Sequence, residues 1–183
     1  MARLTTVDPA GATGETKDLF DAAKASMGAI PNLAKALAVS PTALRAYLVF
    51  REALAGGSLD PTLRERIALG SAEYNACTHC LSAHSFLAKN VAKLSPDEIA
   101  AARRFTSADP RIDAGLRFTR AVLEQRGEVS DDDLDLVRAA GYSDGELAEI
   151  VADVALNTLT NYFNRLADPD NEFPRVEPVA VAA

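Results

Sequence analysis

Residues 63–84 read LRERIALGSAEYNACTHCLSAH and contain both cysteines and both histidines of the 183-residue chain. Cys77, His79, Cys80 and His84 fall within eight consecutive positions. Side chains that serve only packing would not be expected to gather in this way. Cys and His are the residue types best suited to redox, nucleophilic and metal chemistry near neutral pH. We therefore expect the chemistry of this protein to take place in this stretch.

Outside this stretch the sequence carries repeated signals for the starts of helices. A capping side chain precedes a proline at Ser40-Pro41, Asp60-Pro61, Ser95-Pro96 and Asp109-Pro110. Between such signals apolar residues recur at helical spacing, and the alternation typical of strands is absent. The pattern predicts helices over 15–26, 31–38, 41–55, 61–75, 77–91, 96–105, 110–126, 131–140 and 144–166.

These elements predict an all-α fold with a single compact domain over residues 1–183. The redox core is expected at about 61–91, where two predicted helices carry the Cys and His residues. Residues 168–183 are expected to be an irregular tail, because three prolines oppose helix there.

Composition and charge narrow the class of protein. The chain is 48% hydrophobic and 25% charged, which is ordinary for a globular protein. Its net charge of −7 argues against nucleic acid as a partner, because phosphate binding needs a basic face. No run approaches the ~18 apolar residues of a membrane span, and the first residues lack a signal-peptide pattern. We therefore expect a cytoplasmic protein, where a close Cys pair is more often catalytic, redox-cycling or metal-binding than structural.

The spacing within the motif suits redox chemistry on a helix. Asn75-Ala76 is a plausible break between two helices, so that Cys77 stands at a helix start, where unpaired N–H groups and the helix dipole favour a thiolate. Cys80 follows one turn later, close enough for a disulfide. His84 lies on the same face as Cys80, where an imidazole can relay a proton to or from its sulfur.

The other titratable residues near the pair are less clearly placed. His79 is rotated by about 100° from Cys80 on a helical wheel, so it is expected to point elsewhere, tuning the site or lining a wet rim. Glu65 and Glu73 are candidate carboxylates. Glu65 stands between two arginines, which by composition alone indicates a solvated surface. Glu73 approaches Cys77 only if one helix runs unbroken through Ala76.

Two structural alternatives stay open at this point. The cysteines could be two small buried hydrophobic residues, or half of a zinc site. Zinc in proteins usually takes about four ligands drawn from more than one segment, whereas here all the available Cys and His residues are local.

The spacing of the motif resembles that of the AhpD-like alkylhydroperoxidases of the carboxymuconolactone decarboxylase superfamily. Their pattern is Glu, eleven residues, Cys, any residue, His, Cys, three residues, His. It is filled here by Glu65, Cys77, His79, Cys80 and His84. The flanking sequences GAIPNL (28–33), SP (40–41) and NTLTNYFN (157–164) resemble those of a subgroup called peroxidase-related proteins. The resemblance spans about residues 25–175.

The resemblance implies an all-helical fold assembled as trimers or hexamers, and a thiol peroxidase activity without a cofactor or metal. Cys80 would be the peroxidatic thiolate and Cys77 the resolving partner, although the helix dipole alone favours Cys77 as the more acidic thiol. Glu65 and His84 would form the proton relay, with His79 assisting. The substrate would be a peroxide, and the reductant an external dithiol, typically a lipoylated protein.

Two rival functions use the same residues. One is a thiol–disulfide oxidoreductase or adaptor that does not act on peroxide, and the other is a metal-binding or helical interaction module. No glycine-rich dinucleotide motif is present, so electrons are not expected from a bound nicotinamide.

The last predicted helix bears on assembly. Asn157, Asn161 and Asn164 recur at helical spacing beside Tyr162 and Phe163. A polar face of this kind needs hydrogen-bond partners when it is covered, either in a subunit interface or as an internal polar seam. The family resemblance favours the interface and thus a homo-oligomer.

Overall fold

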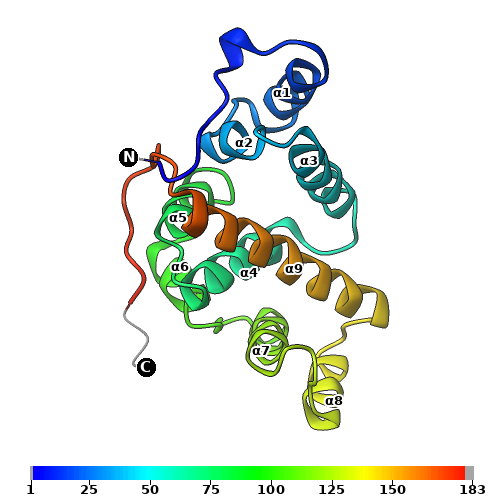
Figure 1. The fold of residues 1–183 in the computed structure, drawn as a ribbon. Helices are drawn as coiled ribbons and strands as arrows, with labels where there is room; N and C mark the ends of the chain where they lie inside the picture. The colour runs from blue at the N-terminus through cyan, green and yellow to red at the C-terminus, as the bar shows by residue number, and fades with distance from the viewer. Residues whose placement is uncertain (1, 180–183) are drawn as a thin grey trace.

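The structure is a computed structural model that describes residues 2–179 (Figure 1). Within this range it contains nine α-helices, one short 3₁₀ helix and no strand, which confirms the predicted all-α fold. No helix in the described range has the length and apolar character that a membrane crossing requires. The elements are η1 (Pro9–Gly11), α1 (Gly14–Met27), α2 (Asn32–Leu37), α3 (Pro41–Ala55), α4 (Pro61–Tyr74), α5 (Thr78–Asn90), α6 (Pro96–Ala102), α7 (Pro110–Gln125), α8 (Asp131–Ala139) and α9 (Asp144–Ala167).

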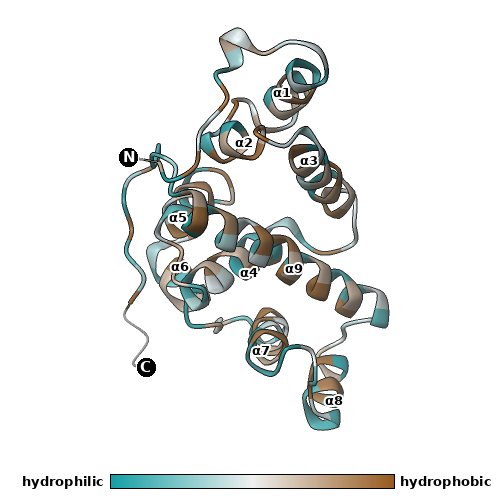
Figure 2. Ribbon diagram, in the orientation of Figure 1, coloured by the Kyte–Doolittle hydropathy of each residue, from teal (hydrophilic) through white to brown (hydrophobic). Residues whose placement is uncertain are grey.

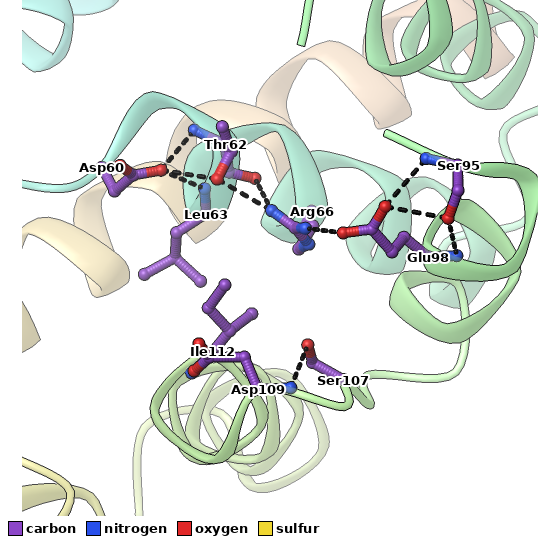
Figure 3. A network of polar contacts seen from close by, with 9 residues as sticks. All are labelled: Asp60, Thr62, Leu63, Arg66, Ser95, Glu98, Ser107, Asp109 and Ile112. Atoms are coloured by element: carbon purple, nitrogen blue, oxygen red, sulfur yellow. Dashed lines mark hydrogen bonds and ion pairs between the residues drawn. The ribbon is translucent and has the colours of Figure 1, made fainter. Parts of the chain in front are cut away.

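The predicted helix starts are confirmed by their caps. Ser40, Asp60 and Asp109 each accept backbone N–H bonds from the first turn of the following helix. Ser95 and Ser143 form capping boxes with the glutamates three residues later. Figure 3 shows two of these caps, at Asp60 and Ser95. Since a cap contributes about 1 kcal/mol, local sequence determines where these helices begin.

One predicted helix extends too far. The helix expected over 96–105 ends at Ala102, and Phe105 lies in the left-handed region with φ +56°. The ring of Phe105 packs directly over Gly70 of α4, where an added Cβ would lie 2.5 Å from its Cε1 atom. Gly70 is therefore required by the close approach of this ring to the helix.

Helix α4 lies at the centre of the domain and packs against α5, α6, α7 and α9. Figure 1 shows the long helix α9 crossing the molecule beside α4, from the end that carries α7 and α8 towards α5. Helices α1, α2 and α3 gather at the opposite end. The two helices expected to hold the redox core are thus α4 and α5, and both also contact α9.

The apolar core consists of three clusters, two of which share α4. Leu63 and Ile67 pack with α7, α8 and α9, whereas Leu69 and Ala72 pack with α5 and α6. The third cluster joins α1, α2 and α3. Figure 2 shows the apolar sides of the helices turned towards one another. All residues of α4 from Arg66 to Ala72 are buried, so this helix is enclosed on every side.

A buried arginine ties α4 to α6. The guanidinium of Arg66 donates to Thr62 of its own helix and to Glu98 Oε1 at 2.7 Å (Figure 3). Only 5% of Arg66 is exposed, so its charge depends on these partners. Glu98 also accepts from Ser95, which links the ion pair to the capping box of α6.

The inward face of α9 is an internal polar seam rather than a subunit interface. Asn157, Asn161 and Asn164 are all buried within the subunit. Asn161 Oδ1 accepts from Asn75 Nδ2 at 3.0 Å, and Asn157 Nδ2 donates to the carbonyl of Asp153 at 2.9 Å. The expectation that these asparagines face another subunit is therefore wrong, because α4, α5 and the turn between them already cover this side of α9.

The C-terminal tail is irregular from 168 to 179, as predicted, and its residues 180–183 lie outside the described part of the chain. It is nevertheless attached to α5 and α6. The amide of Val176 donates to Ser82 Oγ at 3.0 Å, and Arg103 Nη2 donates to the Glu177 carbonyl at 2.9 Å. Thr78 Oγ1 donates to Glu177 Oε2 at 2.8 Å. The tail therefore runs alongside the helix that carries Cys80.

Asp153 is the buried carboxylate of the α9 seam. It is 5% exposed, and its Oδ2 atom has no hydrogen-bond partner among the described residues. Burial raises its pKa to about 6, although the charge of Arg64 acts in the opposite direction. Between pH 3.8 and about pH 6, the folded state therefore binds more protons than the unfolded state. The free energy of unfolding falls as the pH rises through this range, so the ionised Asp153 destabilises the fold above about pH 6.

We expect Asp153→Asn to raise the free energy of unfolding at pH 7.5, by on the order of 2 kcal/mol, because the neutral amide avoids the buried charge. The gain should shrink as the pH falls below about 6 and disappear near pH 4. Urea unfolding at a series of pH values measures it. Asp135→Asn, at an exposed position of α8, is the control and should show no such gain. A stability difference that does not depend on pH would contradict the prediction.

Candidate functional site

The turn between α4 and α5 places Cys77 at a helix start, as the sequence predicts. Ala76 has φ +50°, which breaks the helical path after α4. The amide of Cys77 donates to the carbonyl of Ala72 at 2.9 Å. Cys77 then caps α5, with its Sγ accepting the N–H of Cys80 at 3.2 Å. The sulfur of Cys77 therefore lies at the positive end of the α5 dipole.

Cys77 and Cys80 are joined by a disulfide, with their Cα atoms 5.3 Å apart. This Cα separation is ordinary for a disulfide, so the backbone of the first turn of α5 suits the bond. Cys77 is 1% exposed and Cys80 is 3% exposed. The pair is therefore buried at the junction of α4, α5 and α9.

Glu65 and His84 form a hydrogen-bonded pair across the interface between α4 and α5. His84 Nδ1 lies 2.9 Å from Glu65 Oε1. The side chain of His84 is 25% exposed and that of Glu65 is 18% exposed. Since His84 follows Cys80 by four positions on α5, the imidazole and the sulfur share one face of that helix.

The pKa of His84 is raised above its ordinary value of 6.5. Burial lowers this pKa, but the charge of Glu65 and the hydrogen bond that His84 donates to Glu65 raise it by more, with a further contribution from the charge of Asp153. His84 therefore holds a proton more readily than an isolated histidine. A protonated imidazole near Cys80 would favour the thiolate form of that residue.

The two arginines beside Glu65 point away from the site. The guanidinium of Arg64 donates to the carbonyl of Leu54, at the end of α3, and Arg66 turns towards α6. This arrangement follows from the rotation of about 100° between successive helix positions. Glu65 is thus turned inward to His84 rather than solvated between the two arginines.

Glu73 does not belong to the site. Its carboxylate pairs with Arg103 Nε at 2.7 Å and also accepts the amide of Val179. The helix is interrupted after Tyr74, so the approach of Glu73 to Cys77 along one unbroken helix does not occur. Glu73 instead connects α4 to the C-terminal tail.

His79 lies on a different side of α5 from the Glu65–His84 pair. Its ring packs edge-on against Phe173 of the tail, with the centroids 6.4 Å apart. Burial lowers the pKa of His79 below 6.5, in spite of the nearby carboxylate of Glu172. His79 is therefore a neutral histidine at neutral pH, and its Nδ1 has no partner among the described residues.

A pocket of about 280 Å³ opens on the Cys77 side of the disulfide. Two arginines and an aspartate make its rim polar. It is lined by Arg3, Ala76, Cys77, Thr78, His79, Asn164, Arg165 and Asp168. A partner molecule could reach Cys77 from this side, whereas the Glu65–His84 pair belongs to the interface of α4 and α5.

Three residues of α9 complete the surroundings of the site and were not identified from the sequence as site residues. Asn164 Nδ2 lies 3.3 Å from Cys80 Sγ, and the sulfur also lies 3.8 Å from the carbonyl oxygen of Thr160. Asp153 interacts electrostatically with both His84 and Glu65. An aspartate three positions after the buried Ile150 was the available signal, because it stands on the apolar face of the helix.

The arrangement supplies two sulfurs that can exchange electrons, an acid–base pair and an amide donor at Cys80. Within residues 2–179 no three His, Cys, Asp or Glu side chains converge as ligands for a metal ion. The residues brought together by the fold are those suited to thiol chemistry with proton transfer.

Comparisons with known proteins agree with this arrangement. The sequence profile of the carboxymuconolactone decarboxylase family matches residues 41–124, which include α4, α5 and the motif between them. No curated protein matches the chain.

Several solved structures share the fold. A peroxidase-related protein with an alkylhydroperoxidase AhpD core, from Ralstonia eutropha JMP134, is 26% identical with a TM-score of 0.81, and the match covers 94% of each chain. A peroxidase-related protein from Silicibacter sp. TM1040 is 24% identical with a TM-score of 0.79, covering 93% of this chain and 92% of that one.

The debrominase Bmp8, in complex with 2,3,4-tribromopyrrole, is 21% identical with a TM-score of 0.77, covering 93% of this chain and 91% of that one. The Silicibacter protein and Bmp8 are 24% and 21% identical to this chain, so their similarity to it concerns the fold alone. Together, the comparisons show that the chain has the AhpD-like fold, and that residues 41–124, which hold the motif, match the carboxymuconolactone decarboxylase family.

Proposed function

We propose that the protein is a thiol-dependent alkylhydroperoxidase that reduces peroxides through the Cys77–Cys80 pair. The match to this family and the fold shared with peroxidase-related proteins and a debrominase suggest an enzyme, peroxidase-related or other. The observation that carries the proposal is the 2.9 Å hydrogen bond between Glu65 and His84, one turn along α5 from Cys80 of the disulfide. A redox pair that serves only as a structural link has no use for an adjacent acid–base pair.

The cycle begins with the reduced pair. Glu65, acting through His84, draws the proton from Cys80. The thiolate attacks the distal oxygen of the hydroperoxide, the O–O bond breaks, and the leaving alkoxide takes the proton from His84 to become an alcohol. The Cys77 thiol then condenses with the Cys80 sulfenic acid, which releases water and forms the disulfide seen here. His79, neutral beside the pocket, would assist by shaping access to Cys77.

An external dithiol completes the cycle by thiol–disulfide exchange. We propose a lipoylated protein as its source, by analogy with the AhpD-like enzymes, and the cytoplasm as the compartment. The pocket beside Cys77 supports attack on that sulfur, which releases Cys80 as the leaving thiolate. The reductant's two thiols become a disulfide, and both cysteines return to the reduced state.

Two other functions share this chemistry. A thiol–disulfide oxidoreductase or adaptor would use the pocket and the disulfide but not the peroxide step. The similarity in fold to the debrominase Bmp8 suggests a second alternative, in which the substrate is a halogenated aromatic compound and a cysteine is again the nucleophile. Turnover of cumene hydroperoxide, of a protein disulfide and of 2,3,4-tribromopyrrole with dihydrolipoamide, measured on the same preparation, separates the three. We expect the hydroperoxide to be the best substrate.

A homo-oligomer, either a trimer or a hexamer, is also proposed. An exposed apolar stripe on the outer face of α9 supports it, since Val151, Leu159, Tyr162 and Leu166 recur at helical spacing and are 43–59% exposed. Covering such a stripe is favourable because it removes apolar area from water.

We expect Cys80→Ser to abolish peroxide-dependent turnover and Cys77→Ser to accumulate a sulfenic acid on Cys80, because no resolving thiol remains. Trapping with dimedone after a stoichiometric addition of cumene hydroperoxide, followed by peptide mass spectrometry, locates the adduct. A sulfenic acid trapped on Cys77 in the Cys80→Ser variant would show that the roles of the two cysteines are reversed.

Glu65→Gln should preserve the fold and the disulfide yet slow peroxide reduction by roughly 10²–10⁴, the usual loss when a general base is removed. Without the Glu65 charge the pKa of His84 falls, so the imidazolium is lost and the apparent pKa for thiolate reactivity rises. Rates measured from pH 5 to 9 test both effects. Glu73→Gln, on the same helix but paired with Arg103, is the control and should keep the wild-type profile. An unchanged Glu65→Gln profile would remove Glu65 from the relay.

Light scattering should show a trimer or hexamer rather than the ~19 kDa monomer. Tyr162→Glu, which places a charge in the middle of the exposed stripe, should shift the protein towards the monomer. Leu136→Glu, at an exposed apolar position of α8, should leave the assembly intact. A wild-type monomer at micromolar concentration would refute the proposal.

A further inference from the structure

The sulfur of Cys80 has an unusual set of neighbours. Helix α9 brings the side chain of Asn164 to it, with Nδ2 3.3 Å from Sγ, and the carbonyl of Thr160 lies 3.8 Å away. Asn164 is 4% exposed and Cys80 is 3% exposed, so water has little access to this contact. A buried thiol is harder to ionise, and the lone pairs of a facing carbonyl repel a thiolate further.

The charged groups near α5 do not resolve this difficulty alone. Helix α4 contributes the carboxylate of Glu65, and α9 contributes that of Asp153, both of which oppose a second negative charge. Among cations, His84 of α5 itself is protonated only in part of the pH range. The other charged groups that face the two histidines of α5 are Arg51 of α3, and Asp168 and Glu172 of the tail. A buried N–H donor aimed at the sulfur would therefore stabilise the Cys80 thiolate.

The oxygen atom of the same Asn164 amide makes no hydrogen bond among the described residues. This atom, Oδ1, is buried. An unpaired buried acceptor destabilises a fold, and native structures hold few of them. Asn164 also lines the pocket that opens beside Cys77. The vacant acceptor therefore lies beside the reacting sulfur.

We propose that Asn164 is a catalytic residue: its Nδ2–H group stabilises the Cys80 thiolate, and its Oδ1 receives the O–H group of the hydroperoxide. The second part rests on the proposed peroxidase function, whereas the first does not. When the thiolate attacks the distal oxygen, the O–O bond breaks and the O–H bond persists into the sulfenic acid. The same Oδ1 can therefore accept that hydrogen before and after oxygen transfer, while the alkoxide takes its proton from His84.

The position of Asn164 is fixed by its neighbours on α9. Asn161 Oδ1 accepts from Asn75 Nδ2, and Arg165 Nη1 donates to the carbonyl of Asn75 at 2.9 Å. These bonds hold α9 against the turn that leads into Cys77. The amide is consequently held at the sulfur by two contacts that flank it in sequence.

The first arm of the test measures the thiolate directly. In the Cys77→Ser background, Cys80 is the only thiol, and its alkylation by iodoacetamide as a function of pH reports its pKa. Asn164→Ala should raise that pKa by about 1–2 units, the amount expected when a hydrogen bond to a charged group is lost. Asn164→Asp, which keeps the shape and adds a carboxylate, should raise it further. Asn157→Ala is the matched control, since its amide bonds only to the Asp153 carbonyl.

The second arm adds cumene hydroperoxide to the same proteins and follows sulfenic acid formation at a pH where Cys80 is fully ionised. Asn164→Ala should then still be slower by about tenfold or more, because the acceptor for the O–H group is gone. If the Cys77→Ser protein itself does not react with hydroperoxide, the peroxidase proposal fails, while the alkylation profile still decides the role of Asn164. Circular dichroism verifies the fold of each variant.

The proposal is overturned if Asn164→Ala and Asn164→Asp leave the alkylation profile unchanged. It is also overturned if Asn157→Ala shifts the profile as much as Asn164→Ala, because the effect would then come from disturbed packing of α9. An Asn164→Ala protein that forms the sulfenic acid at the wild-type rate when fully ionised would remove the role of Oδ1.

Discussion

The hydrogen bond between Glu65 and His84 joins the two helices that hold the site, and its geometry depends on how those helices are fixed. Glu65 belongs to α4, which is enclosed by α5, α6, α7 and α9, and His84 belongs to α5. Arg66, the next residue after Glu65, is anchored to Glu98 of α6 (Figure 3). A rotation of α4 that moved Glu65 away from His84 would therefore also break the ion pair of the buried Arg66 with Glu98. The carboxylate is held in place by the packing of its helix.

Helix α9 completes the site from the other side. Its inward face carries polar residues at positions where an ordinary core helix would carry apolar ones, including Asp153, Asn161 and Asn164. Buried polar groups destabilise a fold unless they find partners, and the raised pKa of Asp153 shows part of that cost. Two of these groups connect directly to the region of the redox pair, through Asn75 and through the sulfur of Cys80. The polar seam thus lowers the stability of the fold, and it also places polar groups beside the redox pair.

Much of the fold could be predicted from local sequence. The helix starts at Ser40, Asp60 and Ser95 were predicted because capping depends only on nearby residues. The helix break before Cys77 and the shared face of Cys80 and His84 followed in the same way from short-range geometry. The likeness of the motif to AhpD-like enzymes supplied Glu65, because composition alone indicated a solvated side chain between two arginines.

The remaining features depend on contacts between distant parts of the chain. The end of α6 at Ala102 depends on the packing of Phe105 over Gly70. The attachment of the tail through Val176 and Ser82 has no signal in the local sequence. The three asparagines of α9 were visible, but whether they face inward depends on which side of the helix α4 and α5 cover.

The central claim is that one peroxide oxidises one Cys77–Cys80 pair. The most direct measurement is a titration of the fully reduced wild-type protein with cumene hydroperoxide in the absence of reductant, following free thiols and alcohol product together. The account predicts the loss of two thiols and the formation of one alcohol per hydroperoxide, with an end point at one equivalent per chain and an intramolecular disulfide as the product. Thiols that persist in the presence of excess hydroperoxide, or alcohol formed without loss of thiols, would contradict it.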